Sequence, residues 1–314
     1  MYYIIEIKIC ILICFISYSV ISVFQLKENK NINFILSQFI NESRILNNEI
    51  KQLFQNYSKS NKKKIIGISY SNNELKAQLK YCKKSALEIG KVDLFYGYGP
   101  SDIDIEFKQI NYDILLRKKG DGYWLWKPYF ILKTLNEKLV DGDYLIYTDA
   151  NVLYKENVKV LIDFLQKKDE DMWFYKQNYI EKYYSKRDAF ILMGADTEYY
   201  SETFSYNAAF QIYKKSKFSL KFVTDYLYYS KDKRIITDDK NTLSLPNYNG
   251  FKHHGNDQTI LSLLIKKYNL ANSGRANINY TYINNIENEM PLIFCYYKIL
   301  PFKNYNDLKR LCKI

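Results

Sequence analysis

An apolar segment that ends in a carboxylate constrains the fold of this chain more than any other stretch. Residues 144–147 read Tyr-Leu-Ile-Tyr, a continuous β-favouring run of the kind found in central parallel strands. Asp149 and Asn151 follow, spaced so that both side chains can reach one ligand. In open α/β sheets, ligands bind beyond the carboxyl ends of the strands. The segment predicts either a ligand site at a strand end or a strand followed by an Asp/Asn turn.

Strand and helix patterns alternate along the folded part of the chain. A compact apolar run at residues 65–70 is followed by a helical face that Gly90 closes, and then by a strand pattern at residues 92–96. This β-α-β order predicts a right-handed crossover and a parallel sheet. The alternation continues with a helix pattern at 158–165 and a strand pattern at 172–175. We therefore predict the α/β class. The chain has no glycine-rich dinucleotide fingerprint and no P-loop, which argues against dinucleotide oxidoreductases and P-loop kinases.

Composition excludes a disordered chain and argues against a nucleic-acid partner. The 314 residues are 47% hydrophobic, which is ample for a core. The net charge is +12, but the basic residues are scattered and the densest run is only Lys62–Lys64. A nucleic-acid footprint gathers its basic residues on one face. We therefore expect a solvated basic surface, with nucleotide phosphates as the anionic partner.

The N-terminal segment predicts a membrane anchor. Residues 9–24 are almost uninterrupted apolar sequence, between the length of a signal-peptide core and that of a membrane span. We predict a signal-anchor at residues 1–24, an amphipathic helical stem at 25–64 and a catalytic domain at 65–314. A cleavable signal peptide, which would make the protein secreted, is the alternative.

The compartment is predicted on weaker signals. Three glycosylation sequons, at Asn41, Asn56 and Asn279, favour a single-pass protein with a lumenal catalytic domain, although an asparagine-rich chain makes such matches by chance. Outside the N-terminal segment at most one disulfide can form, and no metal-type cysteine pair exists. The cysteines concerned are Cys82, Cys295 and Cys312.

A tryptophan-rich corner precedes the opening segment. Residues 120–128 read Gly-Asp-Gly-Tyr-Trp-Leu-Trp-Lys-Pro, and Pro128 suits the first turn of a helix. Lys127 beside a helix N-terminus suits a pyrophosphate or sugar phosphate. Trp124 and Trp126 offer flat faces for a sugar or base. The alternative is two core tryptophans and a surface lysine.

A second polar cluster, His-His-Gly-Asn-Asp-Gln at residues 253–258, lies about a hundred residues after Asn151. Asp257 opens a helix pattern, so that it or Asn256 is either an N-cap or a catalytic group. His253 and His254 are candidates to complete a metal or phosphate shell, although a lone histidine is usually structural.

These three motifs together resemble the nucleotide-sugar-dependent glycosyltransferases of the A-type fold, over roughly residues 65–285. They are Gly-Tyr-Trp-Leu-Trp-Lys-Pro at 122–128, Gly-Asp-Tyr-Leu-Ile-Tyr-Thr-Asp-Ala-Asn at 142–151 and Asn-Asp-Gln-Thr at 256–259. The resemblance implies a Rossmann-like nucleotide-diphospho-sugar transferase fold with a mixed, mostly parallel central sheet. It also implies transfer of a hexose from a nucleotide sugar to a glycan or glycoprotein acceptor, with Mn²⁺ or Mg²⁺ as cofactor.

The resemblance also implies roles for individual residues. The metal ligands are Asp149, Asn151 and His254; the donor contacts are Lys127, Trp124, Trp126, Asn207, Gln211 and Gln258; the candidate catalytic carboxylates are Asp257 and Asp188. For Asn207 and Gln211 the alternative is a strand with small packing residues, and for Asp188 an ion pair with Arg187.

Asn151 stands where the family pattern has a second aspartate, which leaves metal independence open. It also leaves open a different class, a non-catalytic carbohydrate- or nucleotide-binding protein on the same fold.

Overall fold

The computed structural model describes residues 63–270, 294–296 and 305–312, together with nine helical positions between 40 and 51. The chain divides into two compact units, Met1–Lys62 and Lys63–Ile314, and each is considered by itself. The predicted anchor at 1–24 and most of the predicted stem lie outside the described residues. Among the residues that are described, we find no helix with the length and apolar character needed to cross a bilayer.

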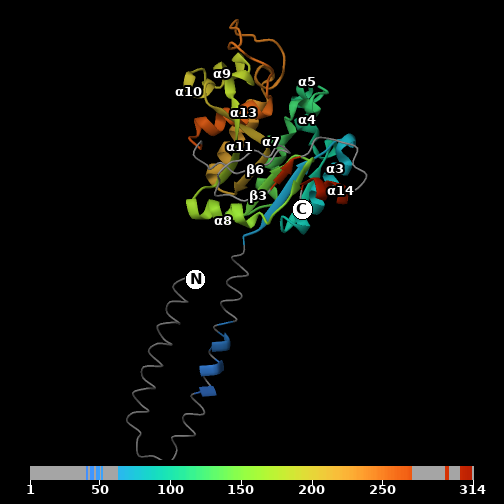
Figure 1. The fold of residues 1–314 in the computed structure, drawn as a ribbon, viewed down its shortest axis with the longest axis vertical. Helices are drawn as coiled ribbons and strands as arrows, with labels where there is room; N and C mark the ends of the chain where they lie inside the picture. Colours follow the sequence, from blue (N-terminus) through green and yellow to red (C-terminus); the bar gives the residue numbers. More distant parts are fainter. Residues whose placement is uncertain are drawn as a thin grey trace, which may run out of the picture. The chain divides into compact units, whose positions relative to one another are not determined.

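A five-stranded sheet of order β2-β1-β3-β6-β5 forms the centre of the second unit (Figure 1). Its strands are β1 (Ile65–Tyr70), β2 (Leu94–Tyr98), β3 (Tyr144–Thr148), β5 (Met172–Ile180) and β6 (Phe204–Lys214). β1 pairs in parallel with β2 and β3, and β6 runs antiparallel to both β3 and β5. Only β6 therefore opposes the other four strands. The predicted α/β class and the mixed, mostly parallel sheet are confirmed.

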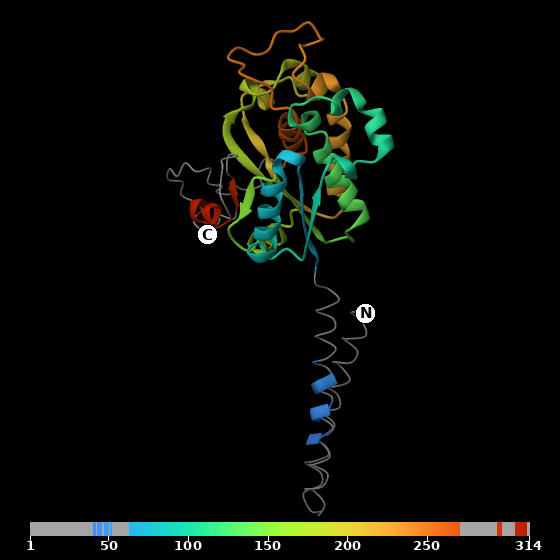
Figure 2. The same ribbon diagram turned by 90° about the vertical axis from the view of Figure 1, so that its right-hand side faces the viewer.

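Helices cover both faces of this sheet (Figures 1 and 2). One face carries α3 (Lys76–Glu88) and α8 (Lys159–Lys168), and the other carries α7 (Trp126–Glu137), α11 (Lys217–Ser230) and α13 (Asp257–Lys267). Alternate residues of β3 enter the two cores: Tyr144 and Ile146 pack on the α3 side, and Leu145 and Tyr147 on the α7 side. The continuous apolar run of β3 is explained by burial on both faces.

Shorter elements connect these layers. They are α4 (Ile105–Ile110), α5 (Tyr112–Leu115), α6 (Gly120–Tyr123), α9 (Arg187–Leu192), α10 (Glu198–Ser201), α12 (Lys233–Ile236), α14 (Tyr305–Cys312), β4 (Val152–Tyr154), β7 (Phe294–Tyr296) and three 3₁₀ turns at Asn73–Leu75, Pro100–Asp102 and Glu181–Tyr183. The predicted strand at 92–96 begins at Leu94 instead. Val92 lies in the turn after α3, where its amide donates to the carbonyl of Ala86 at 3.1 Å.

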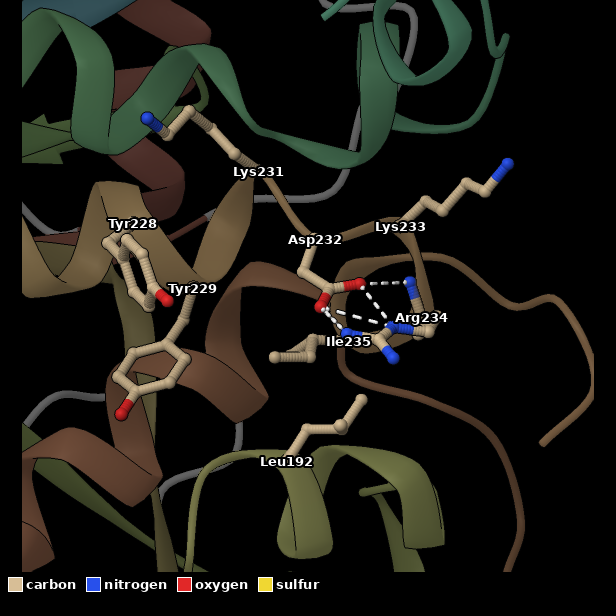
Figure 3. Close-up of a pocket in the computed structure, with 8 residues that line it drawn as sticks. All are labelled: Leu192, Tyr228, Tyr229, Lys231, Asp232, Lys233, Arg234 and Ile235. Carbon is tan, nitrogen blue, oxygen red and sulfur yellow. Dashed lines mark hydrogen bonds and ion pairs between the residues drawn. The ribbon is translucent and has the colours of Figure 1, made fainter. Parts of the chain in front are cut away.

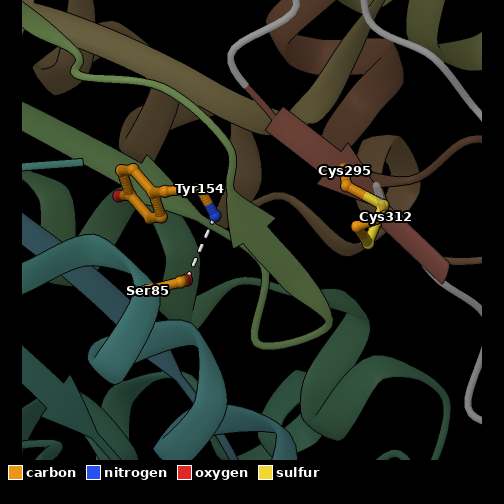
Figure 4. The surroundings of a disulfide bond; sticks show 4 residues. All are labelled: Ser85, Tyr154, Cys295 and Cys312. Carbon is orange, nitrogen blue, oxygen red and sulfur yellow. Dashed lines mark hydrogen bonds between the residues drawn. A yellow bond between two sulfur atoms is a disulfide. The ribbon is translucent and has the colours of Figure 1, made fainter. Parts of the chain in front are cut away.

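A small second sheet attaches the C-terminal residues behind the Asp149 segment. β4 pairs antiparallel with β7, and a disulfide joins Cys295 in β7 to Cys312 in α14 (Figure 4). Cys82 is buried and has a free thiol. The amide of Tyr154 in β4 also donates to Ser85 Oγ on α3, at 3.1 Å. β4 is therefore held on both sides.

Removal of this disulfide should destabilise the second unit. The bond closes a loop with a sequence separation of 17, and a loop of that size constrains the unfolded chain by about 3 kcal/mol. A Cys295→Ser/Cys312→Ser double variant should lose about that free energy of unfolding, measured by urea titration followed by tryptophan fluorescence. A reducing agent should shift the wild type to the variant's midpoint and leave the variant unchanged. Equal midpoints for the two oxidised proteins would contradict the prediction.

Candidate functional site

Asp149 follows β3 directly and is oriented by the strand itself. Tyr147 lies two residues earlier, hence on the same face, and its hydroxyl donates to Asp149 Oδ1 at 2.5 Å. The Asp149 amide donates to the carbonyl of Ala209 on β6 at 3.0 Å. The side chain of Asp149 is 24% exposed, so it is a fixed carboxylate that solvent and ligands can reach.

Lys127 connects Asp149 to Asp257, as part of one cluster. Its Nζ lies 2.7 Å from Asp257 Oδ2 and 3.4 Å from Asp149 Oδ1, and it also donates to the carbonyl of Ala208 at 3.3 Å. The lysine side chain is 2% exposed and that of Asp257 is 5% exposed. The Trp-Lys-Pro corner, the end of β3 and the start of α13 therefore meet at one ammonium group, as the sequence predicts for one common site.

A left-handed turn aims Lys127 into the sheet. Gly120, Asp121, Gly122, Tyr123 and Trp124 all have φ between 53° and 93°, which makes α6 one turn of left-handed helix. Such a conformation costs roughly 1–2 kcal/mol for each residue other than glycine. Interactions with the rest of the fold offset this strain: the Tyr70 hydroxyl donates to Asp121 Oδ2 at 2.8 Å. The turn ends at Tyr123, and α7 begins at Trp126.

A bulge in β6 supplies the backbone partner of Lys127. The register of β5 against β6 jumps from the pair Phe174–Gln211 to the pair Tyr175–Asn207, so that Ala208 and its neighbours are left out of that ladder. The Ala208 carbonyl instead accepts from Lys127, and its amide donates to Gln258 Oε1 at 3.3 Å. Bulges commonly re-aim groups beside active sites. The small residues of this segment therefore lie in the β-bulge, and their backbone groups make the contacts described here.

α13 delivers Asp257 from a strained residue. Asn256, just before the helix, has φ 55° and ψ −119°, and its side chain donates to the carbonyl of Ile236 at 2.7 Å and to Asp238 Oδ1 at 3.0 Å. It does not cap the helix with its side chain. The Tyr226 hydroxyl of α11 donates to Asp257 Oδ2 at 3.3 Å. Asp257 is thus fixed from several sides and largely withdrawn from solvent, which suits a counter-ion of Lys127 better than a base that meets an acceptor.

Burial and charge set the protonation of the cluster. Burial alone would lower the pKa of Lys127, but Asp149 and Asp257 together raise it above the ordinary value, so the ammonium stays charged. Burial raises the pKa of Asp257, although Lys127 opposes that rise. Burial also raises the pKa of Tyr147 and Tyr226 well above 10, and the nearby carboxylates add to the effect. Both tyrosines therefore act as hydrogen-bond donors.

His254 does not join this cluster. Its Nε2 lies 2.6 Å from the carbonyl of Ile235, its Nδ1 accepts from the amide of Lys186 at 3.3 Å, and the residue is 4% exposed. Burial lowers the pKa of His254 to about 3, with a smaller effect from Lys186. Both ring nitrogens are engaged by the protein, so the metal role predicted for His254 is replaced by a structural one. His253 is exposed.

Asp188 is also a structural residue in this fold. It is fully buried, and its carboxylate accepts from the amide and hydroxyl of Thr242 at 2.6 and 2.9 Å and from the amide of Leu243 at 3.3 Å. It therefore anchors the loop that leads to α13. Arg187 does form an ion pair, as one alternative predicts, but its partner is Asp196 at 2.8 Å. The catalytic role predicted for Asp188 does not fit this geometry.

Two of the predicted donor contacts lie inside the protein. Gln211 is fully buried on β6, where Nε2 donates to the carbonyl of Ala208 and Oε1 accepts from Tyr213. Asn207 is 4% exposed, and its Oδ1 accepts from the amide of Ala209 at 2.6 Å. Neither amide faces a sugar, so the packing alternative is the better account of both.

The two tryptophans and Gln258 also contribute differently from the prediction. Trp126 is 5% exposed and stacks on Tyr70 with ring centroids 3.9 Å apart, so its face is covered. Trp124 is half-buried, and its ring lies against Gly120, where an added Cβ would approach to 2.4 Å. Gln258 bridges α13 to the sheet, because it also donates to Gln177 Oε1 at 3.1 Å. Of the two tryptophans, Trp124 is the one whose ring stays partly exposed.

A cavity of about 400 Å³ opens beside the end of β1. Its lining includes Tyr70, Asp121, Ile105 on α4, Tyr112 on α5 and Leu116 just after α5. β1 and β3 are parallel neighbours, and Tyr70 stacks on the residue before Lys127. The cavity is therefore adjacent to the lysine cluster, at the carboxyl edge of the sheet.

A second cavity, of about 520 Å³, contains none of the predicted site residues (Figure 3). Tyr228 and Tyr229 line one side, and Asp232 binds Arg234 at 2.6 Å on the other. Its wall includes Ile235, whose carbonyl faces His254. This cavity lies on α12, away from the carboxylates.

A divalent cation fits the carboxylate cluster only together with a substrate. The hydrogen bond and the ion pair of Asp149 both go to Oδ1, which leaves Oδ2 for a ligand within the described part of the chain. Lys127 already occupies Asp257. No three His, Cys, Asp or Glu side chains converge as a metal group among the residues described. Mg²⁺ is commonly held by one or two carboxylates plus substrate phosphates, and Asp149 with Asn151 matches such a partial set.

The sequence patterns did not predict several residues of the cluster. Tyr147 was detectable, because a strand places residues two apart on one face and Asp149 follows it at that spacing. Tyr226, Gln177 and the carbonyl of Ala208 carry no sequence signal, since only the tertiary fold brings them to the site.

No protein-family model matches the chain, and no curated protein matches it. Solved structures do. An active-site mutant of LgtC covers 79% of this chain and 95% of its own, at 14% identity and a TM-score of 0.41. The galactosyltransferase LgtC with donor and acceptor sugar analogues covers 79% of this chain and 94% of its own, at 14% identity and a TM-score of 0.39. Mouse xyloside xylosyltransferase 1 covers 66% of this chain and 82% of its own, at 11% identity and a TM-score of 0.37. By name, the latter two are a galactosyltransferase and a xylosyltransferase. With identities this low and TM-scores below 0.5, the function proposed below is argued from the site's own residues.

His254 should make stability depend on pH in the acid range. Its folded pKa of about 3 lies below the ordinary histidine value of 6.5, so the unfolded chain binds the extra proton between these pH values and stability falls as pH falls. The slope from this group is about 1.4 kcal/mol per pH unit. His254→Gln should be less stable at pH 7 but should lose this slope between pH 6 and 4, in urea titrations. His253→Gln, its exposed neighbour, is the control and should keep the wild-type slope; an unchanged slope in His254→Gln would refute the assignment.

Proposed function

We propose that this chain is a glycosyltransferase that transfers a hexose from a nucleotide-diphosphate sugar to a glycan or glycoprotein acceptor. The observation that carries the proposal is the buried Lys127–Asp149–Asp257 cluster at the carboxyl end of β3, beside a cavity of about 400 Å³. Ligands of open α/β sheets bind at this edge. The sequence resemblance to A-type glycosyltransferases rests on the same segments.

The division of labour within the cluster follows from exposure. Asp149 is its accessible carboxylate, and Tyr147 and Lys127 fix the orientation of that carboxylate. Asp257 lies behind Lys127 and holds the ammonium in place. A preorganised charged group contributes to catalysis because it needs no rearrangement when charge develops. We assign contact with the donor to Asp149 and positioning to the other two residues.

In the proposed reaction, the bond between sugar C1 and the phosphate oxygen breaks, and its electron pair leaves on the nucleoside diphosphate. An acceptor hydroxyl forms the new bond to C1, and the proton that it loses ends on the released nucleoside diphosphate. The residues that would hold a Mn²⁺ or Mg²⁺ ion are Asp149 and Asn151, and the ion would neutralise charge on the diphosphate. Lys127 keeps its own proton, because its pKa is raised.

The cavity beside β1 is proposed to take the nucleoside of the donor. It adjoins the lysine cluster through the stacked pair Tyr70–Trp126. Ile103, Leu115 and Leu116 give it apolar walls, while Asp121 and Gln109 offer polar groups. An apolar pocket with a few polar groups is the usual form of a small-molecule site.

The disulfide supports placement of the folded domain in an oxidising compartment. Disulfides persist in secreted and lumenal proteins and are rare in the cytosol. Together with the apolar segment at 1–24, this favours a membrane-anchored, lumenal domain, or a secreted one if that segment is cleaved. Localisation of a tagged full-length chain, with protease protection of the tag, tests the proposal.

Asp149→Asn should reduce sugar transfer by about a thousandfold while the fold is retained, because the amide still accepts from Tyr147 but carries no charge. The assay first screens nucleotide sugars with the wild type and then follows nucleoside diphosphate release by the variant. Asp163→Asn is the control, since Asp163 lies exposed on α8. Undiminished turnover of a verified donor by Asp149→Asn would rule out the proposed site. If the wild type turns over no donor but is stabilised by one, the protein is a binding protein on this fold.

Leu116→Trp should block the nucleoside cavity and weaken donor binding by about tenfold or more. Leu116 lines the cavity and is 61% exposed, so the larger ring can fill the space from its rim without disturbing the core. Ile110→Trp is a matched control, because Ile110 is 72% exposed on α4 but does not line the cavity. Thermal shift with the donor identified in the screen gives the readout. Equal shifts for both variants would place the nucleoside elsewhere.

A further inference from the structure

Lys127 forms ion pairs with two carboxylates, which without it would face each other with no cation between them. The Lys127 ammonium forms ion pairs with Asp257 and Asp149 and donates a hydrogen bond to the carbonyl of Ala208. Within the described residues no other Lys, Arg or His forms an ion pair with either carboxylate. The cluster therefore has a formal charge of −1, and it would have −2 without the lysine.

The position of Lys127 is the one that a divalent cation would otherwise take. Both carboxylates lie within 3.4 Å of one point, the Nζ atom. Oxygen ligands so placed suit a hard cation, which binds carboxylates at roughly 2.0–2.6 Å after small adjustments. The oxygens of these two carboxylates are too few for a complete coordination shell. Two negative charges this close would nevertheless attract Mn²⁺ or Mg²⁺ strongly.

A free cation cannot readily displace the lysine. The side chain is 2% exposed, and the rings of Tyr147 and Trp126 lie 5.2 and 5.9 Å from Nζ. The ammonium is also tethered to α7, so that it always returns to the same place at a high effective concentration. Only Asp149 Oδ2 remains for an incoming ligand, because the contacts of Asp149 within the described chain go to Oδ1.

We propose that Lys127 keeps divalent cations off the Asp149–Asp257 pair in the free protein, so that a cation enters only together with the diphosphate of a substrate. The diphosphate part rests on the proposed function, whereas the exclusion by Lys127 does not. Asp149 then contributes one oxygen to a shell that the phosphates complete. Lys127 is a positioning residue that makes metal binding conditional on substrate.

The test titrates Mn²⁺ into the metal-stripped full-length protein and measures free Mn²⁺ by electron paramagnetic resonance. The wild type should bind no Mn²⁺ at this site alone. Lys127→Met, which removes the charge and leaves two carboxylates facing each other, should bind Mn²⁺ about tenfold more tightly or better. The double variant Lys127→Met/Asp149→Asn should lose that gain. Lys133→Met, on the same helix but paired with Asp104, should behave as the wild type.

Inorganic pyrophosphate then stands in for the donor diphosphate. Because pyrophosphate itself binds Mn²⁺, the readout in this experiment is the Mn²⁺ that stays with the protein on gel filtration; the wild type should retain it and Asp149→Asn should not. Thermal melts check that each variant is folded; if Lys127→Met is not, Lys127→Gln replaces it, since it is also neutral but can still donate to Asp257.

The two proposals fail in distinguishable ways. Tight, Asp149-dependent binding of Mn²⁺ alone by the wild type would overturn the exclusion and leave the glycosyltransferase proposal intact. No gain in either neutral variant would also overturn it. Failure of pyrophosphate to recruit Mn²⁺ to the wild type would overturn the substrate-dependent entry and count against the diphosphate site itself.

Discussion

One buried ammonium group holds together parts of the chain that are far apart in sequence. Lys127 joins α7 to the end of β3, to the bulge of β6 and to the start of α13. Removal of one partner from a buried ion pair typically costs about 3–5 kcal/mol, because an uncompensated charge remains. The contacts of Lys127 therefore fix both the placement of β3, β6 and α13 around α7 and the geometry of the candidate site.

Backbone strain gathers around this cluster. The left-handed turn before α7, the bulge at Ala208 and the positive φ of Asn256 each precede or adjoin one member of the cluster. Such conformations persist only where the surrounding structure over-determines them, and they concentrate at functional sites. The stacking of Tyr70 on Trp126 and the two side-chain hydrogen bonds of Asn256 supply that support. The strain is thus consistent with a site that must hold like charges close together.

The sequence predicted the elements of the site better than the contacts within it. β3 and α7 were predictable, because a continuous apolar run and a proline in the first helical turn are local signals. The family resemblance placed Lys127, Asp149 and Asp257 in one site, but their direct ion pairing was not predicted. The roles of Asp188 and His254 were misassigned because their partners, Thr242 and Ile235, lie 54 and 19 residues away in sequence. The strain at Asp121 and Tyr123 lies at non-glycine residues, where only the tertiary fold reveals it.

The pairing of β4 with β7 has a consequence for how the protein is made. β4 follows the Asp149 turn directly, yet its partner strand lies almost half the chain later, with Val152 opposite Tyr296. Such a non-local contact forms late in folding, because closing the long loop between the two strands costs conformational entropy. During synthesis β4, which follows the accessible carboxylate, lacks this partner strand until β7 has left the ribosome. Oxidation of Cys295 and Cys312 then secures β7, so the segment beside Asp149 gains its covalent support only after both cysteines have been synthesised.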